Sequence, residues 1–201
     1  MKEKMNIGEI IKVGLILFLI TAILAALLAF VNEKTAPLIE KNAEAAEAEA
    51  LLTVMPDAAS CEQVDVPDTL TSIARDIGGE IEKAYIAKDP SGNAIGACVI
   101  TVTTGYDIGI RAVTGVDTSL TVTGVDIISM NETPGLGANA DREEFRAQYE
   151  GKKGNIDVVK SAAGEGSIQA IAGATKTSNG VTRGVNIALK AAEILLSGGA
   201  E

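Results

Sequence analysis

The chain has 201 residues, a formal net charge of −10, no histidine and two cysteines. The negative charge argues against nucleic-acid binding, because a phosphate backbone requires a basic surface. Without histidine the chain cannot ligate haem through imidazole or form a Ser-His-Asp triad. Two cysteines are too few for an iron–sulfur cluster, which normally takes four thiolates. If this protein transfers electrons, we expect it to use an organic cofactor.

Residues 13–31 form an uninterrupted apolar run, VGLILFLITAILAALLAFV, that carries no charge. As a helix this run spans roughly 28 Å, close to the thickness of the hydrocarbon core of a bilayer. A cleaved signal peptide is the alternative, but its apolar region usually has about 7–15 residues. The run therefore predicts one N-terminal transmembrane helix.

Lysines set the expected orientation of this helix. The positive-inside bias depends on three lysines before the run and two after it: Lys2, Lys4, Lys12, Lys34 and Lys41. Because the excess lies before the run, we predict that residues 1–12 are cytoplasmic and that the chain after the span lies on the extracytoplasmic side.

Two further segments complete the expected organisation. Residues 32–56 are rich in Ala, Glu and Leu, which predicts a juxtamembrane helix that ends at Pro56. Residues 57–201 then form an extracytoplasmic domain, whose first part, 57–80, gives mixed signals and is interpreted as loop with some short structure. In that domain Cys61 and Cys98 either form a disulfide or remain separate buried thiols.

A β pattern follows from residue 84. Residues 84–87 and 94–104 are separated by the turn cluster 89–93, which predicts a hairpin. Further predicted elements are strands at 111–116, 119–130 and 155–159, a short helix at 141–149 capped by Asn139 or Asp141, and a last helix at 178–197 ended by Gly198-Gly199. The expected class is α+β, an antiparallel sheet with packed helices.

The segment 171–181, IAGATKTSNGV, carries the strongest chemical signal. Small residues enter a predicted helix with Ser178 as its N-cap, and a helix N-terminus offers free amide N–H groups to an anion. Thr175 presents a hydroxyl just before that site, with Lys176 and Arg183 as nearby positive charge. Taken alone, these residues describe either a turn or a loop that holds a phosphate.

This segment resembles the flavinylation motif of the FMN-binding domain found in the G subunit of the Rnf electron-transport complex and the C subunit of the sodium-pumping NADH:quinone reductase. In that family the threonine after Gly-Ala carries FMN through a phosphoester bond, which implies attachment to Thr175. The neighbours Gly173, Ala174, Lys176 and Thr177 then border the cofactor. The chain departs from the family pattern at two positions, where Gln169 replaces an acidic residue and Ala172 replaces Ser or Thr.

A second segment, residues 132–137, reads ETPGLG and is similar to a sequence that lies beside the flavin in the same family. The resemblance implies that Glu132, Thr133, Leu136 and Gly137 are further contacts of FMN. The short chain favours the G subunit of Rnf over the longer C subunit of the reductase. No residue is assigned a catalytic or metal-binding role.

The resemblance implies an electron carrier that is not an enzyme alone. It would be a single-pass subunit of the bacterial inner (cytoplasmic) membrane, carrying covalent FMN in a complex that couples electron transfer from ferredoxin to NAD with sodium or proton export. Implied partners are the other Rnf subunits, especially the integral membrane subunits, and a flavin transferase that attaches FMN from FAD. The alternatives are the C subunit of the NADH:quinone reductase and a membrane-anchored regulatory domain that binds flavin.

Overall fold

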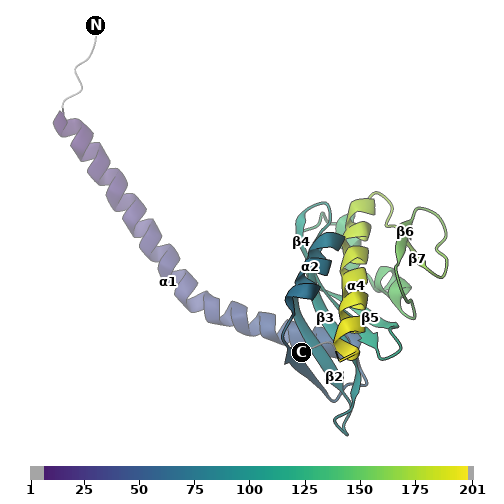
Figure 1. Cartoon of the computed structure of the whole chain (residues 1–201). Helices are drawn as coiled ribbons and strands as arrows, with labels where there is room; N and C mark the ends of the chain where they lie inside the picture. The colour runs from purple at the N-terminus through teal and green to yellow at the C-terminus, as the bar shows by residue number, and fades with distance from the viewer. Residues whose placement is uncertain (1–6, 199–201) are drawn as a thin grey trace. The chain divides into compact units, whose positions relative to one another are not determined.

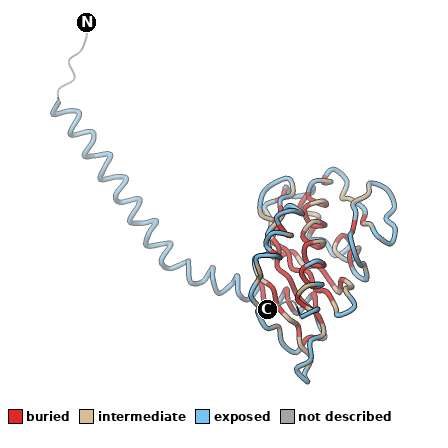
Figure 2. Tube along the Cα trace, viewed as in Figure 1, coloured by how far each residue is buried: buried red, intermediate tan, exposed pale blue. Residues whose placement is uncertain are grey.

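The computed structural model describes residues 7–198, so Lys2, Lys4 and Gly199, which figure in the predictions above, lie outside it. The chain divides into two compact units, Met1–Ala45 and Ala46–Glu201. Helix α1, Ile7–Val54, passes from the first unit into the second and has Pro37 inside it. In the first unit every described residue is exposed (Figure 2). Among the described residues this is the one helix that is long and apolar enough to cross a membrane.

The second unit is built on a five-stranded antiparallel sheet in the order β1-β2-β3-β4-β5. The strands are β1 Ser60–Val64, β2 Gly79–Lys88, β3 Ala94–Thr104, β4 Ile108–Asp117 and β5 Val122–Ser129. The predicted α+β class and the β2–β3 hairpin are confirmed. Its turn is held by Asp89, whose Oδ1 accepts hydrogen bonds from the N–H groups of Ser91 at 2.8 Å and Asn93 at 2.9 Å.

Segment 57–80 has more structure than expected. It contains β1 and helix α2, Asp68–Ile77, in place of the predicted loop. Helix α2 ends at Gly78, which adopts a left-handed φ of 97° and donates its N–H to the carbonyls of Ala74 and Arg75. The polar strand β1 lacks a clear apolar alternation, so its pairing with β2 is not visible in the local pattern.

The predicted short helix at 141–149 is divided into three pieces. Helix α3, Glu143–Arg146, lies between two 3₁₀ turns, η1 Gly137–Asp141 and η2 Ala147–Tyr149. Its N-cap residue is Arg142, so the predicted caps Asn139 and Asp141 were wrong. A parallel pair follows, formed by β6 Asp157–Val159 and β7 Ser167–Gln169, of which β7 had not been predicted.

The last helix, α4, covers Thr175–Leu196 and begins three residues before the predicted start. Ala174 occupies its N-cap position, so the prediction of Ser178 as N-cap was wrong. The Ser178 hydroxyl instead donates to the Ala174 carbonyl at 3.1 Å and accepts the Ile171 N–H at 3.0 Å. It therefore ties the first turn of the helix to the loop that precedes it.

Two helical layers cover the sheet. Helices α2 and α4 lie side by side on one face (Figure 1), and the last turns of α1, from Ala46 onward, contribute Ala50, Leu51 and Val54 to a cluster on the other face. Strand β3 is buried on both sides and accordingly reads as an almost continuous apolar run (Figure 2). Both faces of its central strand are thus removed from water, which fixes the end of the sheet against which α4 begins.

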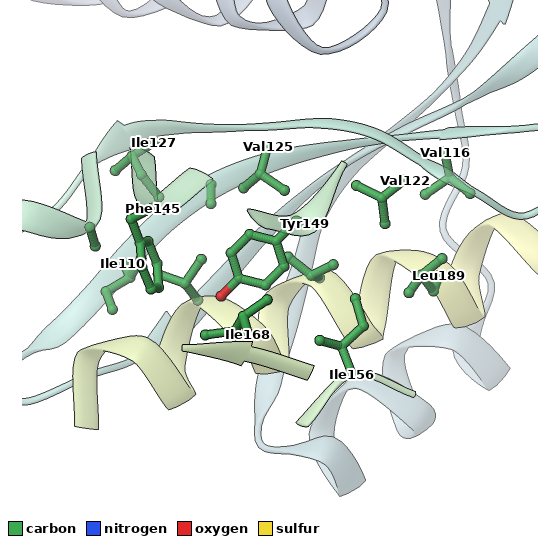
Figure 3. Packing of buried hydrophobic residues seen from close by; sticks show 14 of the residues in the cluster. Ile110, Val116, Val122, Val125, Ile127, Phe145, Tyr149, Ile156, Ile168 and Leu189 are labelled. Atoms are coloured by element: carbon green, nitrogen blue, oxygen red, sulfur yellow. The ribbon is translucent and has the colours of Figure 1, made fainter. Parts of the chain in front are cut away.

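Tyr149 lies in the largest core cluster, between the sheet and α4 (Figure 3). Its ring is fully buried and meets the ring of Phe145 edge to face, with 5.7 Å between centroids. Its hydroxyl is 2.8 Å from the Thr182 Oγ1 atom, which in turn donates to the Ser178 carbonyl. Burial raises the pKa of Tyr149, so the phenol stays protonated and hydrogen-bonded at neutral pH.

Replacing Tyr149 with phenylalanine is expected to lower the free energy of unfolding by about 1 kcal/mol, because one buried hydrogen bond is lost while the ring remains. Urea unfolding of the full chain in detergent measures the change. Tyr106→Phe is the matched control, since Tyr106 is exposed and its hydroxyl is not part of the core. Equal unfolding midpoints for Tyr149→Phe and the wild type would contradict this account of the core.

Both cysteines are free thiols. Cys61 is half-buried on β1 and Cys98 is buried on β3, on the face covered by the end of α1. A hydrogen bond from Cys98 lowers the pKa of the Cys61 thiol to about 7. Of the two alternatives in the sequence, the structure therefore has the separate thiols, lying close enough to interact.

Candidate functional site

A cavity of about 530 Å³ opens at the N-terminus of α4. It lies within the size range typical of sites for small molecules and cofactors. Three segments line it: the β3–β4 loop, the loop after β5, and the loop that enters α4. The structure brings together all nine residues that the sequence singled out, which are Glu132, Thr133, Leu136, Gly137, Gly173, Ala174, Thr175, Lys176 and Thr177. Tyr106 also lines the cavity and was missed.

Thr175 stands at the first position of α4. The first amide N–H groups of a helix have no intrahelical acceptor, so they point toward whatever occupies this end of the cavity. Within residues 7–198 the Thr175 hydroxyl makes no hydrogen bond, and the residue is half-buried. This end of the cavity therefore combines an uncommitted hydroxyl with a site that favours an anion.

The loop before α4 is shaped by Gly173. Its φ of +77° is in the left-handed region, and a Cβ atom there would lie 3.2 Å from the Leu136 side chain. Glycine is therefore the residue that allows this turn and the close approach of the two loops. The backbone thus delivers Thr175 to the cavity wall opposite Leu136.

Glu132 is a buried carboxylate that joins the three segments. Its Oε1 accepts the Tyr106 N–H at 2.9 Å and the Asp107 N–H at 3.3 Å. Its Oε2 accepts the Thr177 hydroxyl at 2.9 Å. Cβ atoms at Gly105 and Gly137 would lie 2.2 and 2.3 Å from these oxygens, so the surrounding backbone closes tightly on the carboxylate. Glu132 therefore holds the cavity walls in place as well as lining them.

The rim of the cavity is largely apolar. Tyr106 is 75% exposed and Leu136 is 46% exposed. The Lys176 ammonium lies 5.5 Å from the centre of the Tyr106 ring, a distance at which cation and ring attract. Arg183, expected as a further charge near the loop, instead donates to the Thr104 carbonyl and does not line the cavity. An aromatic ring, an aliphatic side chain and one cation thus surround the opening.

These residues fit a ligand that combines a flat aromatic ring with a phosphate. The ring system would lie between the apolar side chains of the rim, and the phosphate would lie at the start of α4 beside Thr175 and Lys176. FMN has both parts. The order of groups along the cavity, from an apolar rim to a helix N-terminus, is what such a molecule requires.

Comparison with known proteins agrees with this geometry. Residues 105–190 match the FMN-binding domain, and residues 1–54 match the RnfG N-terminal region. The chain is 40% identical over 200 residues to the G subunit of the Na(+)-translocating ferredoxin:NAD(+) oxidoreductase complex of Acetobacterium woodii, an alignment that covers 94% of this chain and 95% of that protein. The chain belongs to the RnfG family. It is accordingly a component of an ion-translocating ferredoxin:NAD oxidoreductase complex, and the other subunits of that complex are its partners.

The alternative assignment to the NADH:quinone reductase is less well supported than the RnfG family. The C subunit of the Na(+)-translocating NADH-quinone reductase from Vibrio anguillarum is 42% identical, but over 71 residues that cover only 30% of this chain and 28% of that protein. The crystal structure of Shewanella oneidensis NqrC has a TM-score of 0.52 at 19% identity and covers 72% of this chain and 74% of that chain. That likeness shows that the fold is shared between the RnfG family and NqrC.

Proposed function

We propose that this RnfG-family chain is a membrane-anchored electron-transfer subunit that carries FMN esterified to Thr175. In the complex it would lie between ferredoxin and NAD, in a process coupled to sodium or proton export. The observation that carries the proposal is the free Thr175 hydroxyl at the N-terminus of α4, on the wall of a cavity with an apolar rim. Thr177 is the less suitable acceptor, because its hydroxyl is buried and donates to Glu132.

Attachment is a phosphoryl transfer to Thr175. The Thr175 oxygen forms a bond to the FMN phosphorus of FAD, the bond from that phosphorus to the AMP part breaks, and AMP leaves. The hydroxyl proton passes to a base on a separate magnesium-dependent flavin transferase. The free N–H groups at the start of α4 and the Lys176 ammonium are placed to balance the charge of the resulting phosphodiester.

When bound, FMN supplies the capacity to accept and release electrons, and the protein supplies position and environment. Tyr106 and Leu136 would flank its ring at the rim, where a partner can approach. Glu132 keeps the Tyr106 loop and the first turn of α4 at a fixed separation. The ester bond prevents loss of the cofactor outside the cytoplasm, where free flavin is scarce.

The anchor proposal concerns residues 13–31. This apolar part of α1 would cross the membrane once, with residues 1–12 in the cytoplasm and the FMN-binding domain on the extracytoplasmic side. Small residues at Ala22, Ala25, Ala26 and Ala29 would allow close packing against the integral membrane subunits of the complex.

The test is the isosteric change Thr175→Val in a host that contains the flavin transferase. A denaturing gel under ultraviolet light is expected to show a fluorescent wild-type band and no fluorescence in the variant, because a valine side chain cannot form the ester. Thr177→Ser is the matched control, since it keeps the buried hydroxyl and is expected to keep the fluorescent band. A fluorescent Thr175→Val band, or an unmodified mass for wild-type protein from its own host, would refute attachment at this residue.

A further inference from the structure

Gln148 lies outside the FMN cavity, in the 3₁₀ turn η2, and its side-chain amide binds the backbone of β7. Its Oε1 accepts the Gln169 N–H at 2.7 Å, and its Nε2 donates to the Gln169 carbonyl at 3.4 Å. Both peptide groups of one residue are thus held by a single side chain. Gln148 is half-buried, whereas the side chain of Gln169 is exposed.

The two hydrogen bonds lie on the open edge of β7. On the other edge β7 pairs with β6, where the Asp157 N–H binds the Gly166 carbonyl and the Ala170 N–H binds the Val159 carbonyl. Peptide groups of successive strand residues point to opposite edges, so those of Gln169 point away from β6. The Gln148 amide therefore takes the place of a peptide group in a third strand.

This strand leads directly into the attachment loop. Gln169 lies shortly before Thr175 in the chain, and between them the Ile171 N–H donates to the Ser178 hydroxyl at 3.0 Å. The segment is thus fixed at Gln169 by Gln148 and at Ile171 by the first turn of α4. Its conformation is set before any ligand or enzyme arrives.

A second hollow, of about 350 Å³, lies along the same segment. Its wall includes Gln148, Gln169, Ala170 and Ile171, and the exposed Arg142 lies across from them. It is separate from the FMN cavity, since the two have no lining residue in common. The attachment segment therefore has one hollow at its end, where Thr175 stands, and another beside its beginning.

We propose that the strand edge capped by Gln148, together with this second hollow, is the surface on which the flavin transferase holds the chain. Gln148 is a positioning residue that keeps residues 169–171 in the extended form in which Thr175 is presented. The inference rests on the proposed function, because only an enzyme that acts on Thr175 must grip the segment leading to it. A segment ordered in advance loses less conformational entropy on docking and places the hydroxyl more accurately.

The experiment measures initial rates of covalent flavin transfer to the purified full chain in detergent, with flavin transferase, FAD and Mg²⁺. The concentration of the acceptor chain is varied to separate its KM from kcat. Gln148→Ala is expected to lower kcat/KM about tenfold, which corresponds to the loss of one to two hydrogen bonds. Given long incubation it is expected to reach the wild-type extent of labelling, because Thr175 is intact.

Arg142→Ala tests the hollow separately. Arg142 is exposed, so this variant is expected to fold normally and to raise the KM for the acceptor chain at unchanged kcat. Gln148→Glu keeps the acceptor for the Gln169 N–H and is expected to restore most of the rate lost in Gln148→Ala. Gln63→Ala, on an exposed position of β1, is the control and is expected to match the wild type.

The outcomes separate this inference from the proposed function. A wild-type kcat/KM for Gln148→Ala would overturn the role of Gln148 while leaving attachment at Thr175 intact. A wild-type KM for Arg142→Ala would overturn the docking role of the hollow. Absence of label on the wild-type chain with an active transferase would instead overturn the proposed function itself.

Discussion

Replacing Glu132 with alanine is expected to lower the free energy of unfolding by about 3 kcal/mol and to abolish most covalent flavin labelling. The change removes the acceptor of three hydrogen bonds, which come from the N–H groups of Tyr106 and Asp107 and from the Thr177 hydroxyl. Each buried donor left without an acceptor costs about 1 kcal/mol or more. Labelling falls because the three cavity segments lose the group that joins them.

Glu132→Gln is the matched control. Its side-chain oxygen can still accept the Tyr106 N–H, and its amide N–H can donate to the Thr177 oxygen, so the connection between the loop and α4 is kept. We expect this variant to retain most of its stability and its fluorescent band. Urea unfolding in detergent and in-gel fluorescence are the measurements. If Glu132→Ala matched the wild type in both, the carboxylate would not be holding the cavity together.

Most of the sheet could be predicted from local patterns. The β2–β3 hairpin is indicated by a turn cluster between two runs rich in β-branched residues, and such patterns depend on neighbours in sequence. Strand β1 could not be predicted in the same way, because Ser60–Val64 is mostly polar and is a strand only through its pairing with β2. Tertiary pairing, which a local pattern does not contain, decides such segments.

The candidate site shows the same division between local and tertiary information. Two motifs indicated nine cavity residues, since loops rich in glycine and small residues are visible in the sequence. Tyr106 was missed because it is a single aromatic residue in a hairpin turn, with no signal beyond its rarity in the chain. The sequence placed Glu132 beside the cofactor, but it could not show that the carboxylate turns inward to three donors from two other segments.

Glu47 provides another tertiary feature that the sequence concealed. It was part of an acidic run that reads as a solvated helix face, yet its carboxylate is buried against the sheet. Lys83 and Arg111 donate to it at 2.8 and 2.6 Å, and the Tyr85 hydroxyl donates as well. Arg111 is held in turn by Glu82, with 2.5 Å between Nε and Oε2. This network ties the end of α1, from Ala46 onward, to β2 and β4.

These contacts control the ionisation of Glu47. Burial alone would raise the pKa of this carboxyl, but the hydrogen bonds from Lys83, Tyr85 and Arg111 outweigh it and lower the pKa from 4.5 to about 2. Since the folded-state pKa is the lower one, the unfolded chain binds the proton more readily. The stabilisation from Glu47 is therefore complete above pH 4.5 and is lost as the pH falls toward 2.

Glu47→Gln is expected to lower the free energy of unfolding by about 3 kcal/mol at neutral pH, since each pKa unit between the two states corresponds to about 1.4 kcal/mol. The difference from the wild type should shrink as the pH falls below 4.5, because the wild-type carboxyl then becomes protonated. Urea unfolding of the full chain in detergent from neutral pH to about pH 3 measures both features. Glu62→Gln is the control, because Glu62 pairs with Lys88 in full contact with solvent and such pairs contribute little. A difference between Glu47→Gln and the wild type that stayed constant across this range would show that the stabilisation does not come from the carboxylate charge.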